Sequence, residues 1–585
     1  MRLAVLMLSA IVMVAIGGGV MADDKFSAWV ADPLVKVTPD MAPTAVKSVR
    51  IDAVSNEYES GQIVVTSGCD VKKMTASISA FTGPAGPKPQ GKLNVVGYVP
   101  IKHGTKETPD EFLVAKPPAE LPDPLLENKA VSLEKGKNQP VWVSVYVPKG
   151  ATPGQYAASV VINCDDQMMS VPVQVTVHGF ELPDARTLHV VNWFSSIHIA
   201  NTHKVELWSD AFWKWLEVWA RAMGDYRQDT VLTPMPQLVR GIDDGKGNLT
   251  FDFSRFDRWV ELFDRSGVNG IIAGGHMCGR KGGDWSSKEL DAWFINTTMP
   301  DGSWRKWEDT SAVGDEHKKF LSQYMPALQK HLEEKGWLNR YVQHITDEPT
   351  DTNAETYNAV SKILKQYAPK IPIIDASMCE TIAGAIDIWV PQTSGLDRKL
   401  DFYQGRMQMG EEVWIYTCLS PKGKYMNRFV DYHTLSTRLL HWVNFKYDAT
   451  GYLHWGLTYW HGDPFKDLEP NWGGDTFLPP GDDHLVYPSP RGPLSSIRWE
   501  AMRDGIEDYE MLKLLEKQNP KLAAQICDSI VQSFTVYNLD PNAFNAARMT
   551  LIKALSSTEP KSSVSIGYSK DSRSTSAGIQ INLGK

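Results

Sequence analysis

The sequence has little cysteine and no compact metal-binding motif. Its six Cys residues are spread between positions 69 and 527 of 585, and no CxxC or HxH pair occurs. This spacing predicts neither a zinc site nor a dense disulfide framework and leaves any disulfide pairing open. Long basic runs are also absent and the net charge is −9, which argues against a nucleic-acid scaffold or a binder of anionic membranes. The hydrophobic content of 42% is that of an ordinary globular chain.

Only one long apolar run occurs, at residues 3–16, directly after Met1 and Arg2. Glycines and small residues follow, with Val20 and Ala22 at the −3 and −1 positions of a signal-peptidase site. We therefore predict a signal peptide over 1–22 and an exported protein, periplasmic or secreted, with no stable membrane insertion after cleavage. An uncleaved anchor is the alternative, but the run is short and ends in helix-breaking glycines.

Residues 23–182 show the two-residue alternation of half-buried strands. The segments 141–147 and 171–177 place a Val at every second position, and Pro and Gly separate the strand-like runs. This pattern predicts an accessory β-sandwich with one face of each sheet buried and the other wet. The segment contains no cluster of nucleophiles or ligands.

Residues 183–492 instead alternate apolar runs with amphipathic helical patterns. Eight strand-like runs predict a (β/α)8 TIM-like barrel as the catalytic domain. A doubly wound sheet is the main alternative, although no GxGxxG turn follows the first run. The eight runs are 188–194, 230–233, 269–273, 341–346, 371–375, 386–390, 413–416 and 451–455.

Tryptophan is unusually frequent in this region, with 17 of the 20 residues between Trp193 and Trp472. Most must be core residues. Two long segments, 274–309 and 461–492, also carry Trp, and long loops inside a compact domain are usually functional. We expect both loops to form walls over the barrel mouth. A helical region over 493–560 and a polar tail over 561–585 complete the predicted organisation into a mixed, multidomain α and β protein.

Two adjacent acids, Asp347 and Glu348, end the fourth strand-like run and precede Pro349. Active sites of such barrels gather at the carboxyl ends of the strands. Neighbouring like charges raise one pKa, as a general acid requires. Pro349 should hold Glu348 in an extended conformation, and one acid must leave strand geometry for both to converge. The alternative is a capping acid followed by a solvated acid in a turn.

The Asp-Glu-Pro run resembles the motif of glycoside hydrolase family 123. Residues 56–62, NEYESGQ, resemble the sandwich module of that family, and residues 495–512, SSIRWEAMRDGIEDYEML, resemble the signature that closes its catalytic region. The resemblance implies retaining hydrolysis of β-linked N-acetylgalactosamine without a protein nucleophile. In such enzymes the 2-acetamido oxygen of the substrate attacks the anomeric carbon. Asp347 would then orient the acetamide, Glu348 would act as general acid/base, and no metal or organic cofactor would be needed.

Other polar and aromatic residues at strand ends or in the long loops are weaker candidates for contacts with a glycan or glycoconjugate. They are His276, Trp304, Trp414, Tyr416, His454, Trp455, Tyr459, Trp460 and Trp472. Aromatic residues at strand ends are more often packing residues. The charged residues Arg498, Glu500, Arg503, Glu507 and Asp508 have helical spacing and predict a salt-bridged docking face.

Two rival functions stay open at the level of sequence. A metal-dependent hydrolase would use His276, His344 and either Asp347 or His454 as ligands. A carbohydrate-binding protein without turnover would keep the sandwich and a Trp-lined cleft. The sequence does not decide between galacto and gluco configuration, or between endo and exo action.

Overall fold

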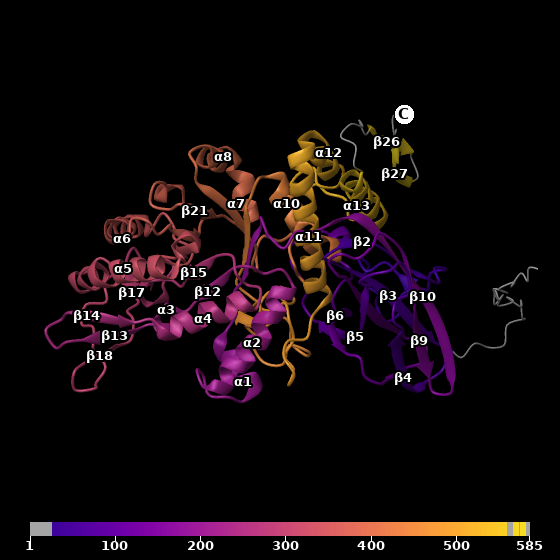
Figure 1. The fold of residues 1–585 in the computed structure, drawn as a ribbon, viewed down its shortest axis with the longest axis horizontal. Helices are drawn as coiled ribbons and strands as arrows, with labels where there is room; N and C mark the ends of the chain where they lie inside the picture. Colours follow the sequence, from indigo (N-terminus) through magenta and orange to yellow (C-terminus); the bar gives the residue numbers. More distant parts are fainter. Residues whose placement is uncertain (1–25, 558–564, 572–573, 581–585) are drawn as a thin grey trace, which may run out of the picture.

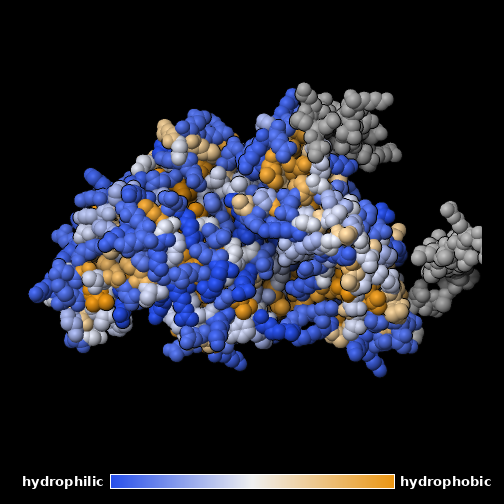
Figure 2. Space-filling view, in the orientation of Figure 1, coloured by the Kyte–Doolittle hydropathy of each residue, from blue (hydrophilic) through white to orange (hydrophobic). Residues whose placement is uncertain are grey.

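The computed structural model describes residues 26–557, 565–571 and 574–580. A strand-rich N-terminal part and a larger part of mixed helices and strands lie at opposite ends of the molecule, with the C-terminal helices between them (Figure 1). The predicted signal peptide lies outside the described residues. Within the described part of the chain, no helix is long and apolar enough to cross a membrane. The face seen in Figure 2 is mainly hydrophilic, with small scattered hydrophobic patches.

The N-terminal part consists of two five-stranded sheets that share one buried core. The Val residues at every second position of 171–177 are buried, and the Pro, Gln and Thr residues between them are partly or fully exposed. The alternation in the sequence predicts this pattern. One sheet has the order β1 (Phe26–Ala31), β3 (Glu57–Ser67), β8 (Asn138–Val147), β5 (Gln90–Ile101) and β6 (Ala119–Glu127). The other has the order β2 (Val49–Ser55), β10 (Gln167–Glu181), β9 (Gly154–Cys164), β4 (Val71–Ile78) and β7 (Val131–Leu133).

The outer face of one sheet is not wet, contrary to the prediction. Trp142 of β8 is 2% exposed and packs in one cluster with Ile497, the first residue of α11 (Ile497–Gln518). Because both faces of β8 are covered, residues of both faces are buried along nearly the whole strand. The N-terminal sheets therefore pack against the rest of the molecule through β8.

Each of the eight predicted runs in the central part overlaps a strand, and all paired neighbours run parallel. The strands form a five-stranded sheet, β11-β23-β22-β21-β20, and a three-stranded sheet, β12-β15-β19. Their bounds are β11 (His189–Asn192), β12 (Val231–Thr233), β15 (Ile272–Gly274), β19 (Tyr341–Gln343), β20 (Ile374–Ala376), β21 (Ile388–Val390), β22 (Glu412–Tyr416) and β23 (Gly451–His454).

The two central sheets touch at both seams. A parallel bridge joins Gln343 to Ile373 beside β19 and β20, and the amide of Thr230 donates to the carbonyl of Val190, 3.2 Å away, beside β12 and β11. Side chains from all eight strands meet in one apolar cluster. The two sheets thus share one apolar cluster, to which each strand contributes residues from alternate positions.

Helices connect most of these strands. The amphipathic helix α4 (Ser254–Arg265) buries Phe256, Trp259, Val260 and Phe263, which lie on one face at helical spacing. The connecting helices include α1 (Ser196–His203), α2 (Asp210–Asp225), α3 (Met235–Leu238), α5 (Asp315–Lys335), α6 (Ala354–Tyr367), α7 (Thr393–Arg398), α8 (Leu400–Gln408), α9 (Thr434–Arg438) and α10 (Leu440–Lys446). Between β20 and β21 the described chain has only the 3-10 turn Glu380–Ile382.

The two long segments predicted as loops contain short strands. The first segment contributes β16 (Cys278–Arg280), β17 (Leu290–Ala292) and β18 (Thr297–Thr298), and the second contributes β24 (Asn471–Gly473) and β25 (Thr476–Phe477). The connection before the first segment also forms a hairpin of β13 (Arg240–Asp243) and β14 (Leu249–Asp252). Strand β18 pairs with β13, so backbone hydrogen bonds fix the first loop.

The C-terminal region is helical, with α11, α12 (Pro520–Ile530) and α13 (Pro541–Ser556). The five charged residues of the predicted docking face, all on α11, are at most 2% exposed. Arg498 pairs with Asp123 of β6, 2.9 Å away, and Asp508 pairs with Arg438 and Arg548 at 2.7 and 3.1 Å. In the described parts of the range predicted as a polar tail, the chain instead forms an antiparallel pair, β26 (Ser565–Asp571) and β27 (Ser574–Gln580).

Candidate active site

The acid pair follows β19, where the carboxyl ends of the parallel strands meet. Asp347 and Glu348 are both partly buried, and Pro349 is buried. Glu348 has a φ of +42°, so the expectation of an extended Glu348 before proline is wrong. A left-handed backbone is strained in a residue other than glycine, and such strain is concentrated at functional sites. This turn takes Glu348 out of strand geometry directly after Asp347, as convergence of the two acids requires.

Glu348 is held from two sides. The Tyr416 hydroxyl at the end of β22 donates a hydrogen bond to Oε1 of Glu348, and the Arg280 guanidinium donates to its main-chain oxygen, 2.5 Å away. Burial, with the negative charge of Asp347, raises the pKa of Glu348, although Tyr416 and Arg280 lower it in part. A buried carboxyl group of raised pKa can keep its proton near neutrality and donate it.

Two histidines and a further acid lie beside this pair. The rings of His276 and His344 are 4.9 Å apart, and burial lowers the pKa of each to about 4. Asp375 at β20 accepts hydrogen bonds from His344 Nδ1 at 3.0 Å, the Ile345 amide at 3.0 Å and the Tyr357 hydroxyl at 2.7 Å. Both imidazoles are therefore neutral near pH 7. Burial raises the pKa of Asp375 to about 8, and its hydrogen bond with Nδ1 fixes the orientation of His344.

This cluster is also where a metal ion would be held. One ligand atom each from His276, His344 and Asp375 lies within 4.8 Å of the others. The metal-site alternative named two of these residues, but the third is Asp375 and neither Asp347 nor His454. Both oxygens of Asp375 already accept hydrogen bonds, so an ion bound here would share this carboxyl group with the existing donors.

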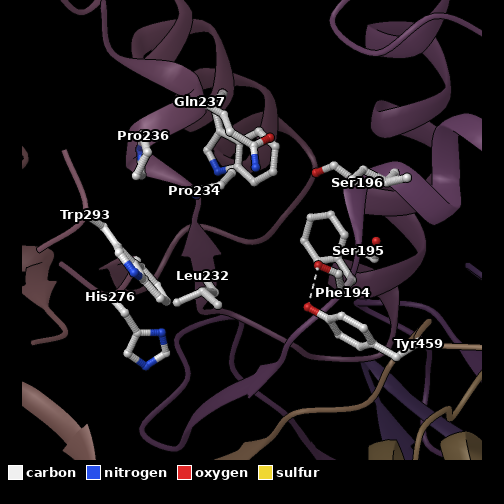
Figure 3. A pocket seen from close by; sticks show the side chains of 13 residues that line it. Phe194, Ser195, Ser196, Leu232, Pro234, Pro236, Gln237, His276, Trp293 and Tyr459 are labelled. Atoms are coloured by element: carbon white, nitrogen blue, oxygen red, sulfur yellow. Dashed lines mark hydrogen bonds between the residues drawn. The ribbon is translucent and has the colours of Figure 1, made fainter. Parts of the chain in front are cut away.

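A cavity of about 310 Å³ opens next to the histidines. Its walls come from the ends of β11, β12 and β15 and from the loops after them, and Trp293 and His276 face Tyr459 and Phe194 across it (Figure 3). The Tyr459 hydroxyl lies 3.4 Å from the main-chain oxygen of Phe194. His276 belongs to both the cavity wall and the histidine cluster and interacts electrostatically with Asp347. Asp347 and Glu348 themselves are not among the wall residues. Apolar walls with few polar groups are typical of ligand sites.

The remaining wall residues of this cavity come from the same strand ends and from the helices α1, α3 and α4. They are Ser195, Ser196, Ile197, Leu232, Pro234, Pro236, Gln237, Trp259 and Gly275.

Three of the weaker candidates are packing residues. Trp414 is 1% exposed and lies in the apolar cluster inside the eight strands, because it precedes Tyr416 by two positions and is deeper along β22. His454 is completely buried and accepts a hydrogen bond from Arg428, with the two atoms 2.6 Å apart. Trp460 donates to the main-chain oxygen of Val486 at 2.9 Å and stacks on His198, with ring centroids 5.9 Å apart.

The other candidates lie near solvent. Trp472 is 55% exposed and its ring centre is 6.2 Å from that of Trp455, which follows β23. Trp304 is 64% exposed and lies away from the acid pair, at a second cavity. The exposed Trp residues of the described chain are Trp285, Trp293, Trp304 and Trp472, all in the two loops predicted as walls.

Three participating residues were not predicted as site residues. Asp375 is the last residue of the fifth predicted run, so its position at a strand end was a usable signal. Trp293, which is 47% exposed and lines the cavity, belongs to the first Trp-rich loop. Arg280 offered no signal, because its contact with Glu348 spans 68 residues.

Comparison with family models agrees with the sequence motifs. Residues 193–515 match the catalytic domain of glycoside hydrolase 123, and residues 34–164 match the glycoside hydrolase 123 N-terminal domain. Since the first match covers more than half of the chain, this protein belongs to glycoside hydrolase family 123 and is a glycosidase. The family prediction is thereby confirmed. Among proteins with curated descriptions, none matches the sequence.

A solved structure of a family 123 enzyme shows the same fold. A family 123 glycoside hydrolase from Clostridium perfringens, studied for glycolipid glycan hydrolysis, is similar over 91% of this chain and 97% of its own, with a TM-score of 0.70 and 16% identity. At this identity the likeness concerns the fold alone. A GH10 xylanase from termite gut covers 63% of this chain and 90% of its own at 12% identity, and Parabacteroides merdae β-glucuronidase covers 78% and 51% at 9%. Their TM-scores of 0.32 and 0.29 carry no argument.

Proposed function

We propose that this glycosidase hydrolyses β-linked N-acetylgalactosamine with retention of configuration, using the 2-acetamido group of the substrate as the nucleophile. The observation that carries the proposal is the adjacency of Asp347 and Glu348 after β19. An ordinary retaining pair acts from opposite sides of the scissile bond, about 5–5.5 Å apart. Two consecutive residues are poorly suited to opposite faces of a sugar, whereas substrate-assisted catalysis needs no protein carboxylate as nucleophile on the face opposite the leaving group.

Glu348 is the proton donor in this proposal. Its raised pKa lets it give a proton to the leaving oxygen and, as a carboxylate, take one from the incoming water. The hydrogen bond from Tyr416 aligns its carboxyl group and stabilises the carboxylate formed after proton transfer.

Asp347 accepts the acetamide N–H and turns the carbonyl oxygen toward the anomeric carbon. Its negative charge then stabilises the positive charge that develops on the bicyclic oxazolinium intermediate. The C1–O bond to the leaving group breaks as the acetamide oxygen forms its bond to C1. Water later opens the ring and restores the acetamide, so no glycosyl ester with the protein forms.

Three further features belong to the proposal. The eight parallel strands form a (β/α)8 barrel over 183–492, and the N-terminal sheets form an accessory β-sandwich over 23–182. The helical region over 493–560 follows the barrel as a separate part. A signal peptide over 1–22 directs export to the periplasm or the medium. The apolar cluster shared by the eight strands supports the first of these features. No metal or organic cofactor takes part.

A panel of aryl β-glycosides tests the proposal. The N-acetylgalactosaminide should be hydrolysed, whereas the galactoside, which lacks the acetamide, should be hydrolysed at least about 10²-fold more slowly. Equal rates on both would contradict substrate assistance. The rate on the N-acetylglucosaminide, compared with the rate on the N-acetylgalactosaminide, measures the preference between gluco and galacto configuration. Dialysis against a chelator should leave the rate of hydrolysis unchanged if no metal takes part.

A further inference from the structure

A second cavity lies on the other side of the short helix α3. It has a volume of about 320 Å³ and shares two wall residues, Pro236 and Gln237, with the first cavity. Figure 3 shows both residues at the edge of the first cavity, on α3. The side chains of Arg240, Asn296 and Trp304 also line the second cavity. The short helix α3 therefore forms part of the wall between the two spaces, together with α4, which contributes Trp259 to the first cavity and Arg255 to the second. A ligand that extends out of the first cavity over Gln237 reaches the second.

Trp304 is the aromatic wall of the second cavity, and its backbone is fixed. Trp304 bridges Thr298, the Arg305 amide donates to the Thr297 carbonyl at 2.8 Å, and the Met299 amide donates to the Ser303 carbonyl at 2.8 Å. Yet its side chain is 64% exposed. A large aromatic surface held in solvent on an ordered backbone costs hydrophobic free energy unless a ligand covers it.

The exposed indoles in these loops differ in their contacts. Trp285 has the Arg280 guanidinium 3.5 Å above its ring, Trp293 packs edge-on to His276, and Trp472 lies beside Trp455. Within the described residues, no ring, cation or hydrogen-bond acceptor contacts the indole of Trp304. It is thus the exposed indole with a face left open.

Polar groups surround this open indole. Arg255 donates to the main-chain oxygen of Gln237 at 3.0 Å, which stabilises the wall between the cavities. Arg240 keeps a side chain that is 56% exposed, with one nitrogen 3.7 Å from Asp252. Asn296 is exposed and offers both an amide donor and a carbonyl acceptor. An apolar face beside hydroxyl-binding groups suits a pyranose ring, which has an apolar C–H face and a rim of hydroxyls.

We propose that the second cavity is a sugar-binding subsite for a residue of the glycan chain beyond the sugar cleaved next to Glu348. This inference rests on the proposed function. The distal sugar stacks on Trp304. Its hydroxyls accept hydrogen bonds from Arg240 and from the amide of Asn296 and donate to the carbonyl oxygen of Asn296. The glycan chain crosses Gln237. The enzyme accordingly prefers oligosaccharides to short glycosides, and the preference resides in Trp304.

Chain length provides the test. Values of kcat/KM are measured for the wild type and Trp304→Ala with an aryl N-acetylgalactosaminide and with oligosaccharides of two to four sugars that carry the same terminal residue. The ratio of the longest to the shortest substrate should fall on the order of tenfold in the variant, equivalent to about 1.4 kcal/mol. Trp304→Phe, which keeps an aromatic face, should recover most of the ratio.

Controls separate binding from folding. Met168→Ala, which removes another exposed apolar side chain on β10, should not change the ratio. An unchanged ratio in Trp304→Ala, or an equal loss on short and long substrates, would overturn the subsite.

Failure of the proposed function would look different. If the N-acetylgalactosaminide is not hydrolysed, the same oligosaccharides are titrated into wild type and Trp304→Ala by calorimetry. Weaker binding of only the longer sugars by the variant would support the subsite, and equal binding would overturn it.

Discussion

Carboxylates are buried in two regions of this molecule, and their partners differ. Where α11 meets the N-terminal sheets, Glu59 and Asp508 each contact both Arg438 and Arg548 at 2.7–3.1 Å. The arginines lower the pKa of both acids despite complete burial. These acids are ionised and held in place.

At the strand ends the acids have less compensation. Within the described residues, no Lys or Arg side chain is ion-paired with the carboxylate of Asp347 or Glu348. Glu348 has a tyrosine hydroxyl and a like charge as neighbours, and its pKa is raised although Tyr416 and Arg280 lower it in part. The comparison teaches that two arginines keep Glu59 and Asp508 ionised, whereas Glu348, beside another acid and without an ion-paired arginine, can keep a proton for transfer.

The largest effect should come from removing the charge at the site itself. Asp347→Asn cannot stabilise the developing oxazolinium charge, so turnover should fall about 10²–10⁴-fold with activated and poor leaving groups alike. Steady-state kinetics on dinitrophenyl and phenyl N-acetylgalactosaminides measure this. Asp351→Asn, a change of the same type four residues away, is the matched control. Full activity of Asp347→Asn with the activated substrate would contradict the assigned role.

Breaking the compensated region should cost stability instead. Arg438→Met leaves Asp508 and Glu59 buried with one arginine fewer, and we expect a loss of about 3–5 kcal/mol in the free energy of unfolding. Arg221→Met, which removes only a surface pair with Glu217, should cost less than about 1 kcal/mol. Urea unfolding distinguishes the two, and equal losses would show that the buried network is energetically neutral.

Tyr416→Phe should have an intermediate effect on catalysis. The change removes the hydrogen bond that favours the ionised form of Glu348, so the pKa of Glu348 should rise and the alkaline limb of the rate profile should move to higher pH. A charged hydrogen bond contributes about 1.5 kcal/mol, which corresponds to roughly tenfold in kcat/KM. Tyr156→Phe, which removes a hydroxyl from the N-terminal core, is the control. An alkaline limb that stays in place or moves to lower pH would show that the Tyr416 hydroxyl does not stabilise the ionised form of Glu348.

The smallest effect concerns the pH dependence of stability. Burial raises the pKa of Glu57 to about 8 and also raises those of Asp504 and Glu507. Such acids bind protons more tightly in the folded state, so their contribution is complete below the ordinary carboxyl pKa and is lost as pH rises through about 8. Glu59 and Asp508, whose pKa values are lowered, are ionised in the folded and the unfolded state between about pH 5 and 8. They therefore do not make the free energy of unfolding depend on pH in this range.

Buried histidines with lowered pKa values, such as His276 and His344, add stability as pH rises through about 6.5, so the effect of Glu57 is measured as a difference. The urea midpoint of Glu57→Gln relative to that of the wild type should rise between pH 5 and 8, because the amide resembles the protonated acid. A difference that stays constant or falls over this interval would contradict the account.

Much of the fold could be predicted because it depends on local patterns. The eight apolar runs each overlap a strand, and the alternation of Val171, Val173 and Val175 matches a buried face. The contacts that join distant segments could not be predicted. Arg438 binds Glu59 across 379 positions, and Trp142 is covered by a helix that begins at Ile497.

The candidate site was predicted in part for the same reason. A position at a strand end correctly indicated the acid pair and Tyr416. The same rule was wrong for Trp414, because it lies two positions before the end of β22 and packs in the apolar cluster of the strands. The rule for residues before proline failed at Glu348, because tertiary contacts from Arg280 and Tyr416 hold the left-handed turn.

The most direct test of the central claim is the leaving-group dependence of Glu348→Gln. If Glu348 is the uncompensated acid that protonates the leaving oxygen, the variant should lose about 10²–10⁴-fold in kcat with phenyl N-acetylgalactosaminide. The loss should shrink to less than about tenfold with the dinitrophenyl compound, whose leaving group needs little protonation. An equal loss on both substrates would contradict the claim that Glu348 is the proton donor.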